Sequence, residues 1–188
     1  MSGAPLHAQS SRRSLRAVLG AVVAIATITT VAVACSHTSD HPAAPTTGSI
    51  VSSSPISGAP AGSVGWRIVY TTTTASGAPA QSSGTVYVPT TPAPSGGRPV
   101  VAWAHPTLGM GADCTPSQAT DPSTAIPGFA QMIANGWVIT STDYTGLGTE
   151  GVLPYLVGLG ESHDVIDSVR AARNLAGTDA GTNYAVWG

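Results

Sequence analysis

Short runs of β-branched and aromatic residues alternate with loops rich in glycine, proline and serine in the middle of the chain. The runs "GWRIVYTTTT" (65–74) and "GTVYVP" (84–89) have the composition of strands, and the loop between them favours an antiparallel pair. A third run, "RPVVAWAH" (98–105), is almost continuously apolar. Such a run is typical of a central strand that is covered on both faces of its sheet.

Hydrophobic residues recur at helical spacing in two later segments. They predict a short helix over residues 126–135 and a longer helix over residues 161–176. A buried strand, "WVITSTDY" (137–144), is predicted between the two helices. A short apolar run, "YAVW" (184–187), follows the second helix and predicts a last strand.

The predicted order is strand, strand, strand, helix, strand, helix, strand. Strands that alternate with helices indicate a mostly parallel sheet with right-handed crossovers, here preceded by an antiparallel edge. The sequence therefore predicts the α/β class, and the order matches the N-terminal half of an α/β-hydrolase. In that fold the loop after the third strand supplies a backbone N–H of the oxyanion hole, and the fifth strand leads into the nucleophile turn G-x-S-x-G.

The terminal run would be the strand that precedes the nucleophile, with Gly188 as the first glycine of the turn. The triad residues would then lie beyond Gly188, because the serines in "AGSVG" (61–65) and "GESHD" (160–164) do not follow a strand. We expect the terminal strand to be central in a complete sheet and to leave an exposed apolar edge here. A place at a solvent-facing rim, or outside any ladder, would count against this interpretation.

The N-terminus has the pattern of an export signal. Arg12, Arg13 and Arg16 precede an uncharged run over residues 17–34, which ends at Cys35, so residues 1–35 are predicted to be a signal peptide. A permanent membrane anchor is the alternative, since about 18 residues reach the lower limit for crossing a bilayer. The alanines before the cysteine favour cleavage.

Two features refine the export prediction. The stretch "SRRSLRA" resembles a twin-arginine signal, and "AVAC" resembles a bacterial lipobox in which Cys35 is acylated. Simple cleavage after Ala34 is the alternative to lipidation. We expect a secreted or cell-envelope protein that meets a membrane only through the signal peptide or a lipid anchor.

Residues 36–62 consist mainly of serine, threonine, proline, alanine and glycine. A segment of this kind buries too little apolar surface to offset the entropy of ordering, so a disordered linker is predicted. The folded domain is predicted to span residues 63–188. Its charge is low: the whole chain has 9% charged residues and a formal net charge of -2. Seven Lys and Arg residues, three of them in the first 16 positions, cannot form a basic stripe, so nucleic acid is not an expected partner.

Two long stretches resemble the secretory lipase family, which includes yeast lipase A types and actinobacterial exported lipases. "VVAWAHPTLGMGADCTPS" is similar to the oxyanion-loop region of that family. "STDYTGLGTEGVLPYLVGLGESHDVIDSVRAARNL" is similar to its next strand, glycine-rich loop and helix. The similarity extends from about Trp66 to Gly188 and therefore covers nearly all of the predicted domain.

The resemblance implies a role for Asp113, in the stretch "ADCTPS". In relatives of this kind the aspartate donates its backbone N–H to the oxyanion, where a fixed dipole stabilises developing negative charge. The alternative is that Asp113 only begins a turn ahead of Pro116. Cys114 is the only cysteine after Cys35, and the resemblance implies a disulfide with a residue that this chain lacks.

Three other residues are candidates for the lining of a pocket. His105 ends the third strand, and Asp143 and Tyr144 end the fourth, where α/β active sites lie. His105 could equally be a semi-buried structural histidine, and the loop itself could explain the other two. A metal site of His105, Asp113 and Cys114 lacks recognised ligand spacing, so no metal or cofactor is expected.

These features together predict an exported lipase or carboxylesterase that hydrolyses triacylglycerols or other esters in lipid catabolism. The chain itself holds no Ser-His-Asp triad at any recognised position, and we expect it to be inactive alone. Two alternatives stay open: a non-catalytic exported lipoprotein with a hydrolase-like half domain, and a peptidase or polyester hydrolase of the same fold. The expected partner is a lipid or another ester substrate.

Overall fold

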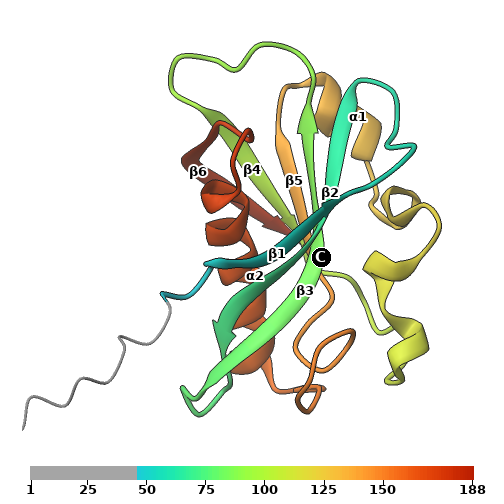
Figure 1. The fold of residues 1–188 in the computed structure, drawn as a ribbon, viewed down its shortest axis with the longest axis vertical. Helices are drawn as coiled ribbons and strands as arrows, with labels where there is room; N and C mark the ends of the chain where they lie inside the picture. The colour runs from blue at the N-terminus through green and yellow to red at the C-terminus, as the bar shows by residue number, and fades with distance from the viewer. Residues whose placement is uncertain (1–45) are drawn as a thin grey trace, which may run out of the picture. The chain divides into compact units, whose positions relative to one another are not determined.

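Six strands form one mixed sheet with the order β1-β2-β3-β5-β4-β6 (Figure 1). The computed structural model describes residues 46–188, so the predicted signal peptide and Cys35 lie outside the described residues. The strands are β1 (Ile50–Pro55), β2 (Ser63–Thr73), β3 (Pro79–Pro89), β4 (Arg98–Trp103), β5 (Val138–Thr142) and β6 (Ala180–Trp187). The helices are α1 (Phe129–Ala134) and α2 (Gly158–Asn174), with 3-10 turns η1 (Ala112–Cys114), η2 (Pro116–Gln118) and η3 (Pro122–Ala125).

The predicted change from antiparallel to parallel pairing is confirmed. β2 pairs antiparallel with β3, and β3 pairs antiparallel with β5. β5 and β6 then lie on either side of β4, both parallel to it. A close approach fixes one residue of this ladder: a Cβ on Gly84 would lie 2.2 Å from the carbonyl oxygen of Ser141 on the neighbouring strand. Only glycine fits there without moving the backbone.

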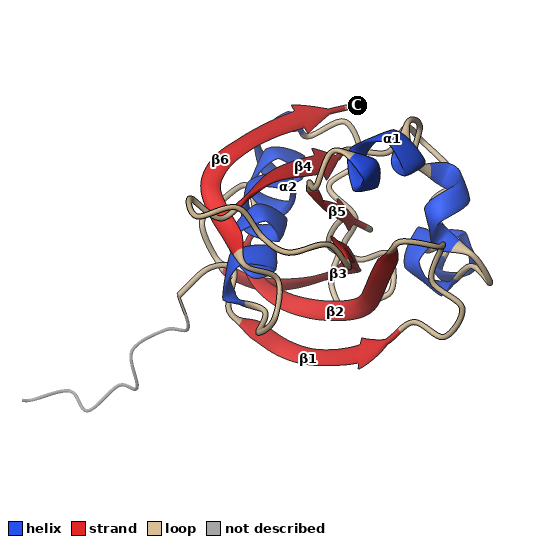
Figure 2. Ribbon diagram, turned by 90° about the horizontal axis from the view of Figure 1, so that it is seen from above, coloured by secondary structure: helices blue, strands red, loops and turns tan. Residues whose placement is uncertain are grey.

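The two helices cover opposite faces of the curved sheet, with α2 inside the curve and α1 outside it (Figure 2). Alternate residues of β4 point to the two sides. Val100 and Ala102 belong to the core under α2, whereas Val101 and Trp103 pack with the residues of α1. Burial on both faces explains why the β4 segment is apolar without alternation, as the sequence indicated.

The prediction of a disordered linker up to residue 62 is wrong for its last part, because β1 lies inside that segment. Five residues of β1 pair with β2, from Ile50 opposite Tyr70 to Pro55 opposite Trp66. The side chains of β1 are mostly exposed, so the strand is held by backbone hydrogen bonds and not by a hydrophobic face. The serine-rich sequence "IVSSSP" therefore carries no hydrophobic signal that would have revealed it.

The terminal segment forms β6, which is longer than predicted and pairs with β4 over Val100–Trp103. The exposed edge that we expected is confirmed, since β6 is the last strand of the described sheet and Tyr184 and Val186 are about half exposed. The segment is thus inside a β ladder but at its rim. The central position that the esterase interpretation expects is not seen among residues 46–188.

The helices begin and end within about three residues of their predicted limits, and no helix in the described part of the chain is long and apolar enough to cross a membrane. α2 starts at Gly158, three residues earlier than its predicted start at residue 161. α1 starts at Phe129, after Gly128 in a left-handed conformation at its N-cap. The loop before α1 extends from the end of β4 at Trp103 to Phe129, is longer than predicted, and contains the three 3-10 turns η1, η2 and η3.

The free edge of β6 should cause self-association, because the outer side of this uncharged strand is unpaired among residues 46–188 and the strand carries exposed apolar side chains. We predict that Val186→Lys lowers concentration-dependent light scattering severalfold and leaves the far-UV circular dichroism unchanged. The matched control is Val51→Lys on β1, the other edge strand, because Val51 and Val186 are 50% and 51% exposed. Equal effects of the two substitutions would show that the β6 edge has no special role.

Candidate active site

The carboxyl ends of the three parallel strands meet at one edge of the sheet. The Ala104 N–H, just after β4, donates a hydrogen bond of 2.7 Å to the carbonyl oxygen of Trp187 at the end of β6. His105 follows directly, and Asp143 and Tyr144 follow β5. Active sites of open α/β sheets form outside this edge, where the loops after neighbouring strands face one another.

A cavity of about 220 Å³ lies at this edge. Its wall combines residues of the loop after β4, the loop after β5 and the first turn of α2. Among the lining residues are His105, Leu108, Tyr144, Leu147, Leu153 and Glu161. The wall is mainly apolar with a few polar groups, which is the usual make-up of a pocket for a small organic ligand.

His105 and Tyr144 form the polar part of the wall. Their ring centroids are 4.6 Å apart, and the Tyr144 hydroxyl donates to the His105 carbonyl oxygen at 3.3 Å. Burial raises the pKa of Tyr144 to about 12, so its hydroxyl is protonated at neutral pH. The Nδ1 atom of His105 lies 2.8 Å from the carbonyl oxygen of Pro106.

Tyr144 has a φ of 67°, in the left-handed region that side chains other than glycine rarely adopt. Its N–H donates to the hydroxyl of Thr142 at 3.0 Å, which helps to hold this turn. Strained backbone of this kind gathers at functional sites, where the surrounding structure determines it. In this conformation the phenol ring lies against the His105 ring.

Asp143 lies behind the cavity and is not among its lining residues. The carboxylate accepts hydrogen bonds from the Ser83 hydroxyl at 2.6 Å, the Ser117 N–H at 2.8 Å and the Ser117 hydroxyl at 2.5 Å. Burial raises the pKa of Asp143 above its usual value, and these hydrogen bonds, which favour the charged form, offset part of that rise. Asp143 therefore joins β3 and the loop after β4 to the end of β5.

Asp113 lies on the exposed turn η1 in the loop after β4. Its neighbours use their backbone N–H groups within the turn: Cys114 donates to Gly111 and Thr115 donates to Ala112. The Asp113 N–H donates no hydrogen bond to any described residue. This amide is thus available to an acceptor outside residues 46–188, as the predicted oxyanion role requires, though that role stays a prediction.

Cys114 is a free thiol among the described residues and lies beside Gly109, since a Cβ on that glycine would be 2.3 Å from the Cys114 sulfur. Its predicted disulfide with an absent residue stays a prediction. No group of three or more His, Cys, Asp or Glu side chains in residues 46–188 is arranged to hold a metal ion. The described site therefore offers no such cluster around His105, Asp113 and Cys114.

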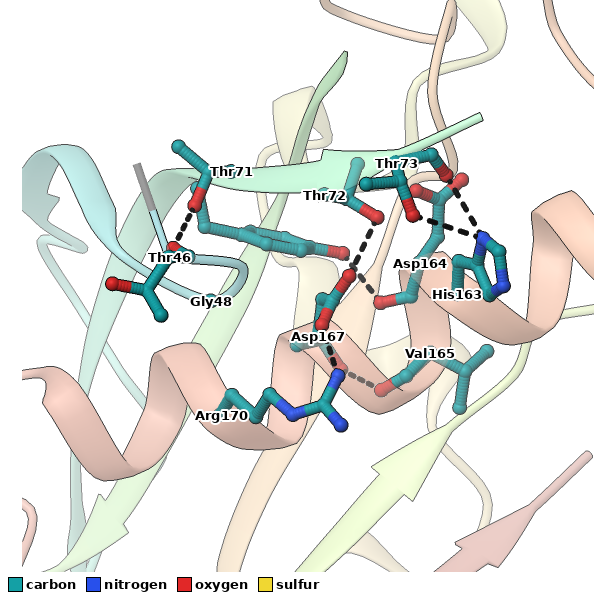
Figure 3. A network of polar contacts seen from close by, with 12 residues as sticks. Thr46, Gly48, Thr71, Thr72, Thr73, His163, Asp164, Val165, Asp167 and Arg170 are labelled. Carbon is teal, nitrogen blue, oxygen red and sulfur yellow. Dashed lines mark hydrogen bonds and ion pairs between the residues drawn. The ribbon is translucent and has the colours of Figure 1, made fainter. Parts of the chain in front are cut away.

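Two buried carboxylates on α2 were not singled out from the sequence. Asp164 accepts from the Thr145 N–H at 2.8 Å and from the Thr145 hydroxyl at 2.9 Å. Asp167 accepts from the Thr72 hydroxyl at 2.9 Å and pairs with Arg170 at 2.5 Å (Figure 3). Acidic residues at helical spacing on the apolar side of a helix are the only sequence signal that could have revealed them.

The second described histidine, His163, is not at the cavity. Its Nδ1 atom contacts the Thr73 hydroxyl of β2 at 3.0 Å (Figure 3), and His163 is not among the residues that line the cavity. Neither His105 nor His163 is hydrogen-bonded to a serine hydroxyl within residues 46–188.

The described residues form part of an α/β-hydrolase fold, as comparison with solved structures shows. The rice cell wall degrading esterase LipA from Xanthomonas oryzae superposes with a TM-score of 0.63 at 24% identity, covering 76% of this chain and 42% of the esterase. Lipase A of Candida antarctica superposes with a TM-score of 0.58 at 17% identity, covering 75% of this chain and 35% of the lipase. At these identities the likeness establishes the fold.

The chain spans about two fifths of the length of the esterase structures that it matches. No family model matches the sequence, and no curated protein matches it. The fold class predicted from the sequence is confirmed. The secretory lipase family stays a prediction.

The buried Asp164 should make stability depend on pH. Burial, more than any other cause, raises its pKa above the ordinary value of 3.8, and the nearby Asp167 raises it further. The folded state then binds the proton more tightly than the unfolded state, so this carboxyl lowers stability as pH rises from about 4 through its raised pKa. Asn cannot ionise and has no such effect.

We therefore predict that the difference in melting temperature between the wild type and Asp164→Asn shifts in favour of the variant as pH rises through this window. Thermal melts at steps of half a pH unit measure it. Asp167 and Tyr70 face this carboxyl in both proteins, and their electrostatic coupling to Asp164 is part of the effect that the substitution removes. A difference that does not change with pH would show that Asp164 ionises as freely in the folded state as in the unfolded state.

Proposed function

We propose that this chain forms the substrate-binding and oxyanion-binding part of an exported lipase or carboxylesterase. The observation that carries the proposal is the cavity that His105 and Tyr144 help to line, outside the carboxyl ends of β4 and β5, in an α/β-hydrolase fold. Its mainly apolar wall suits the acyl or alkyl part of an ester. The esterase and lipase among the structural neighbours add support for a hydrolase.

The chemistry of such an enzyme assigns the loop after β4 a specific task. A serine hydroxyl attacks the ester carbonyl, a histidine takes up the hydroxyl proton, and a carboxylate orients the histidine. The carbonyl oxygen becomes an oxyanion, which backbone N–H groups stabilise. In this proposal the Asp113 N–H is one of these donors, and the triad is supplied from outside residues 46–188.

Export belongs to the same proposal. The basic residues and uncharged run of residues 1–35 have the pattern of a signal peptide, with "SRRSLRA" pointing to the twin-arginine route. Lipid attachment at Cys35 and simple cleavage after Ala34 are the two alternatives for the mature N-terminus. A mass measurement of the protein recovered from a bacterial envelope fraction distinguishes them, because a diacylglycerol group adds far more mass than the uncertainty of the measurement.

Binding of an ester without turnover is the expected behaviour of this chain. We predict that p-nitrophenyl butyrate gives a saturation-transfer NMR signal with the folded protein and that no p-nitrophenol above background is released. Leu153→Trp should weaken binding severalfold, because Leu153 lines the cavity of about 220 Å³ and the indole would fill it. The matched control is Val152→Trp, since Val152 is 88% exposed and does not line the cavity.

Two results would contradict this proposal. Release of p-nitrophenol by purified, folded protein would show that the chain holds its own nucleophile. Equal binding by the wild type and Leu153→Trp, or no binding by either, would show that the cavity is not an ester pocket. Circular dichroism of each variant establishes that the protein is folded before either result is interpreted.

A second candidate function is a non-catalytic exported binding protein with a hydrolase-like half domain. The lack of any serine–histidine hydrogen bond among residues 46–188 favours it. The two candidates differ in the coding DNA that follows codon 188. A continuing frame that begins His-Ser-x-Gly-Gly favours the esterase, whereas unrelated sequence favours the binding protein.

A further inference from the structure

The loop after β4 carries the amide that the proposed function requires, yet it contains no helix longer than four residues. A loop of short turns does not hold a donor in place by its own hydrogen bonds. The question is therefore what fixes the loop to the sheet. The hydrogen bonds from the sheet converge on one residue of the loop, Ser117, which is buried within η2.

The backbone of Ser117 is held from both sides by oppositely charged side chains. On one side its N–H and hydroxyl donate to the two carboxylate oxygens of Asp143 at 2.8 and 2.5 Å. On the other side its carbonyl oxygen accepts from the Arg67 Nε at 2.7 Å. Hydrogen bonds to charged partners are roughly twice as strong as neutral ones.

Each charged group is itself fixed to the sheet. Arg67 is on β2, and its Nη2 also donates to the carbonyl oxygen of Ala119 at 3.0 Å. Asp143 follows β5, accepts from the Ser83 hydroxyl and donates its own N–H to the Ser83 carbonyl oxygen at 2.8 Å. The loop is thus attached to β2, β3 and the end of β5 through Ser117, with one further hydrogen bond at Ala119.

Thr115 carries this attachment towards Asp113. Thr115 is buried, and its hydroxyl and N–H both donate to the Ala112 carbonyl oxygen, at 2.6 and 3.2 Å. A Cβ on Gly148 would lie 2.7 Å from the Ser83 hydroxyl and 2.8 Å from the Thr115 methyl group, so the three residues lie against one another. The peptide of Asp113 therefore lies within the turn from Ala112 to Thr115, and Thr115 at the end of this turn is packed against Ser83 and Gly148.

We propose that Asp143, Ser117 and Arg67 act as a clamp that positions the Asp113 N–H at the oxyanion site. Asp143 is thereby a positioning residue and not a catalytic one, because its carboxylate contacts Ser117 and Ser83 and does not line the cavity. This inference rests on the proposed function for its purpose. The effect of the clamp on the order of the loop can be tested without any ester.

Hydrogen–deuterium exchange of the backbone amides at residues 112–118 tests the clamp in the full chain. We expect Asp143→Asn and Ser117→Ala each to raise exchange in this segment by at least about tenfold at neutral pH, the effect of losing one charge-assisted hydrogen bond. Exchange in β4 and β5 should rise far less. Peptide-resolved labelling of Cys114 with iodoacetamide should accelerate in parallel, because its sulfur lies against Gly109 in the closed loop.

The matched control is Asp167→Asn, which removes another buried carboxylate with a hydroxyl partner and a nearby arginine. It should lower global stability and leave exchange at residues 112–118 unchanged. Arg67→Lys keeps the charge but cannot donate to both carbonyl oxygens in the same geometry, so an intermediate rise is expected. If Asp143→Asn does not fold, Ser117→Ala, which keeps the N–H donor, still decides the question.

Equal exchange at residues 112–118 in the Ser117→Ala, Asp167→Asn and wild-type proteins would overturn the clamp. The proposed function fails by a different result, the absence of ester binding in the cavity. Faster exchange of the loop in the clamp variants, together with no ester binding, would support the clamp and contradict the proposed function. Ester binding with an unaltered loop would keep the pocket and remove the clamp.

Discussion

Parallel pairing of β4 with both β5 and β6 is the constraint on which the rest of the molecule depends. It brings the carboxyl ends of three strands to one edge, so that His105, Tyr144 and the last residues of β6 become neighbours although they are far apart in the sequence. The pairing is stable because β4 is buried on both faces, under α2 on one side and beside α1 on the other. The cavity exists only because this edge is fixed.

Buried carboxylates then attach the loops to that edge. Asp143 holds the loop after β4, and Asp164 holds the loop after β5 through Thr145. Most of their partners are hydroxyl and backbone N–H groups, not cations. The pKa values of both carboxyls are raised because burial disfavours the charged form more than these hydrogen bonds favour it. A loop held by directional bonds at this cost keeps a defined shape, which a hydrophobic contact alone would not impose.

The sequence predicted those elements that bury a continuous or periodic apolar face. β4, β5 and both helices were found near their true limits because their burial leaves a readable pattern. β1 was missed because "IVSSSP" is held by backbone bonds at an exposed edge. At the site, strand ends indicated His105 and Tyr144, but the partners of Asp143 could not be predicted: Ser83 and Ser117 are 60 and 26 residues away, and isolated serines carry no periodic signal.

Three features of β4, the loop after it and β6 lack a partner among residues 46–188. The Asp113 N–H, in the loop after β4, has no described acceptor, and the indole N–H of Trp103, at the end of β4, is buried without a hydrogen-bond partner among residues 46–188. β6 presents the exposed side chains of Tyr184 and Val186 on a strand whose outer edge is unpaired among residues 46–188. Unsatisfied polar groups and an open apolar edge each cost free energy, and both costs fall when more structure covers the same place. In the proposed esterase, the nucleophile turn would follow β6 and lie at this same end of the sheet.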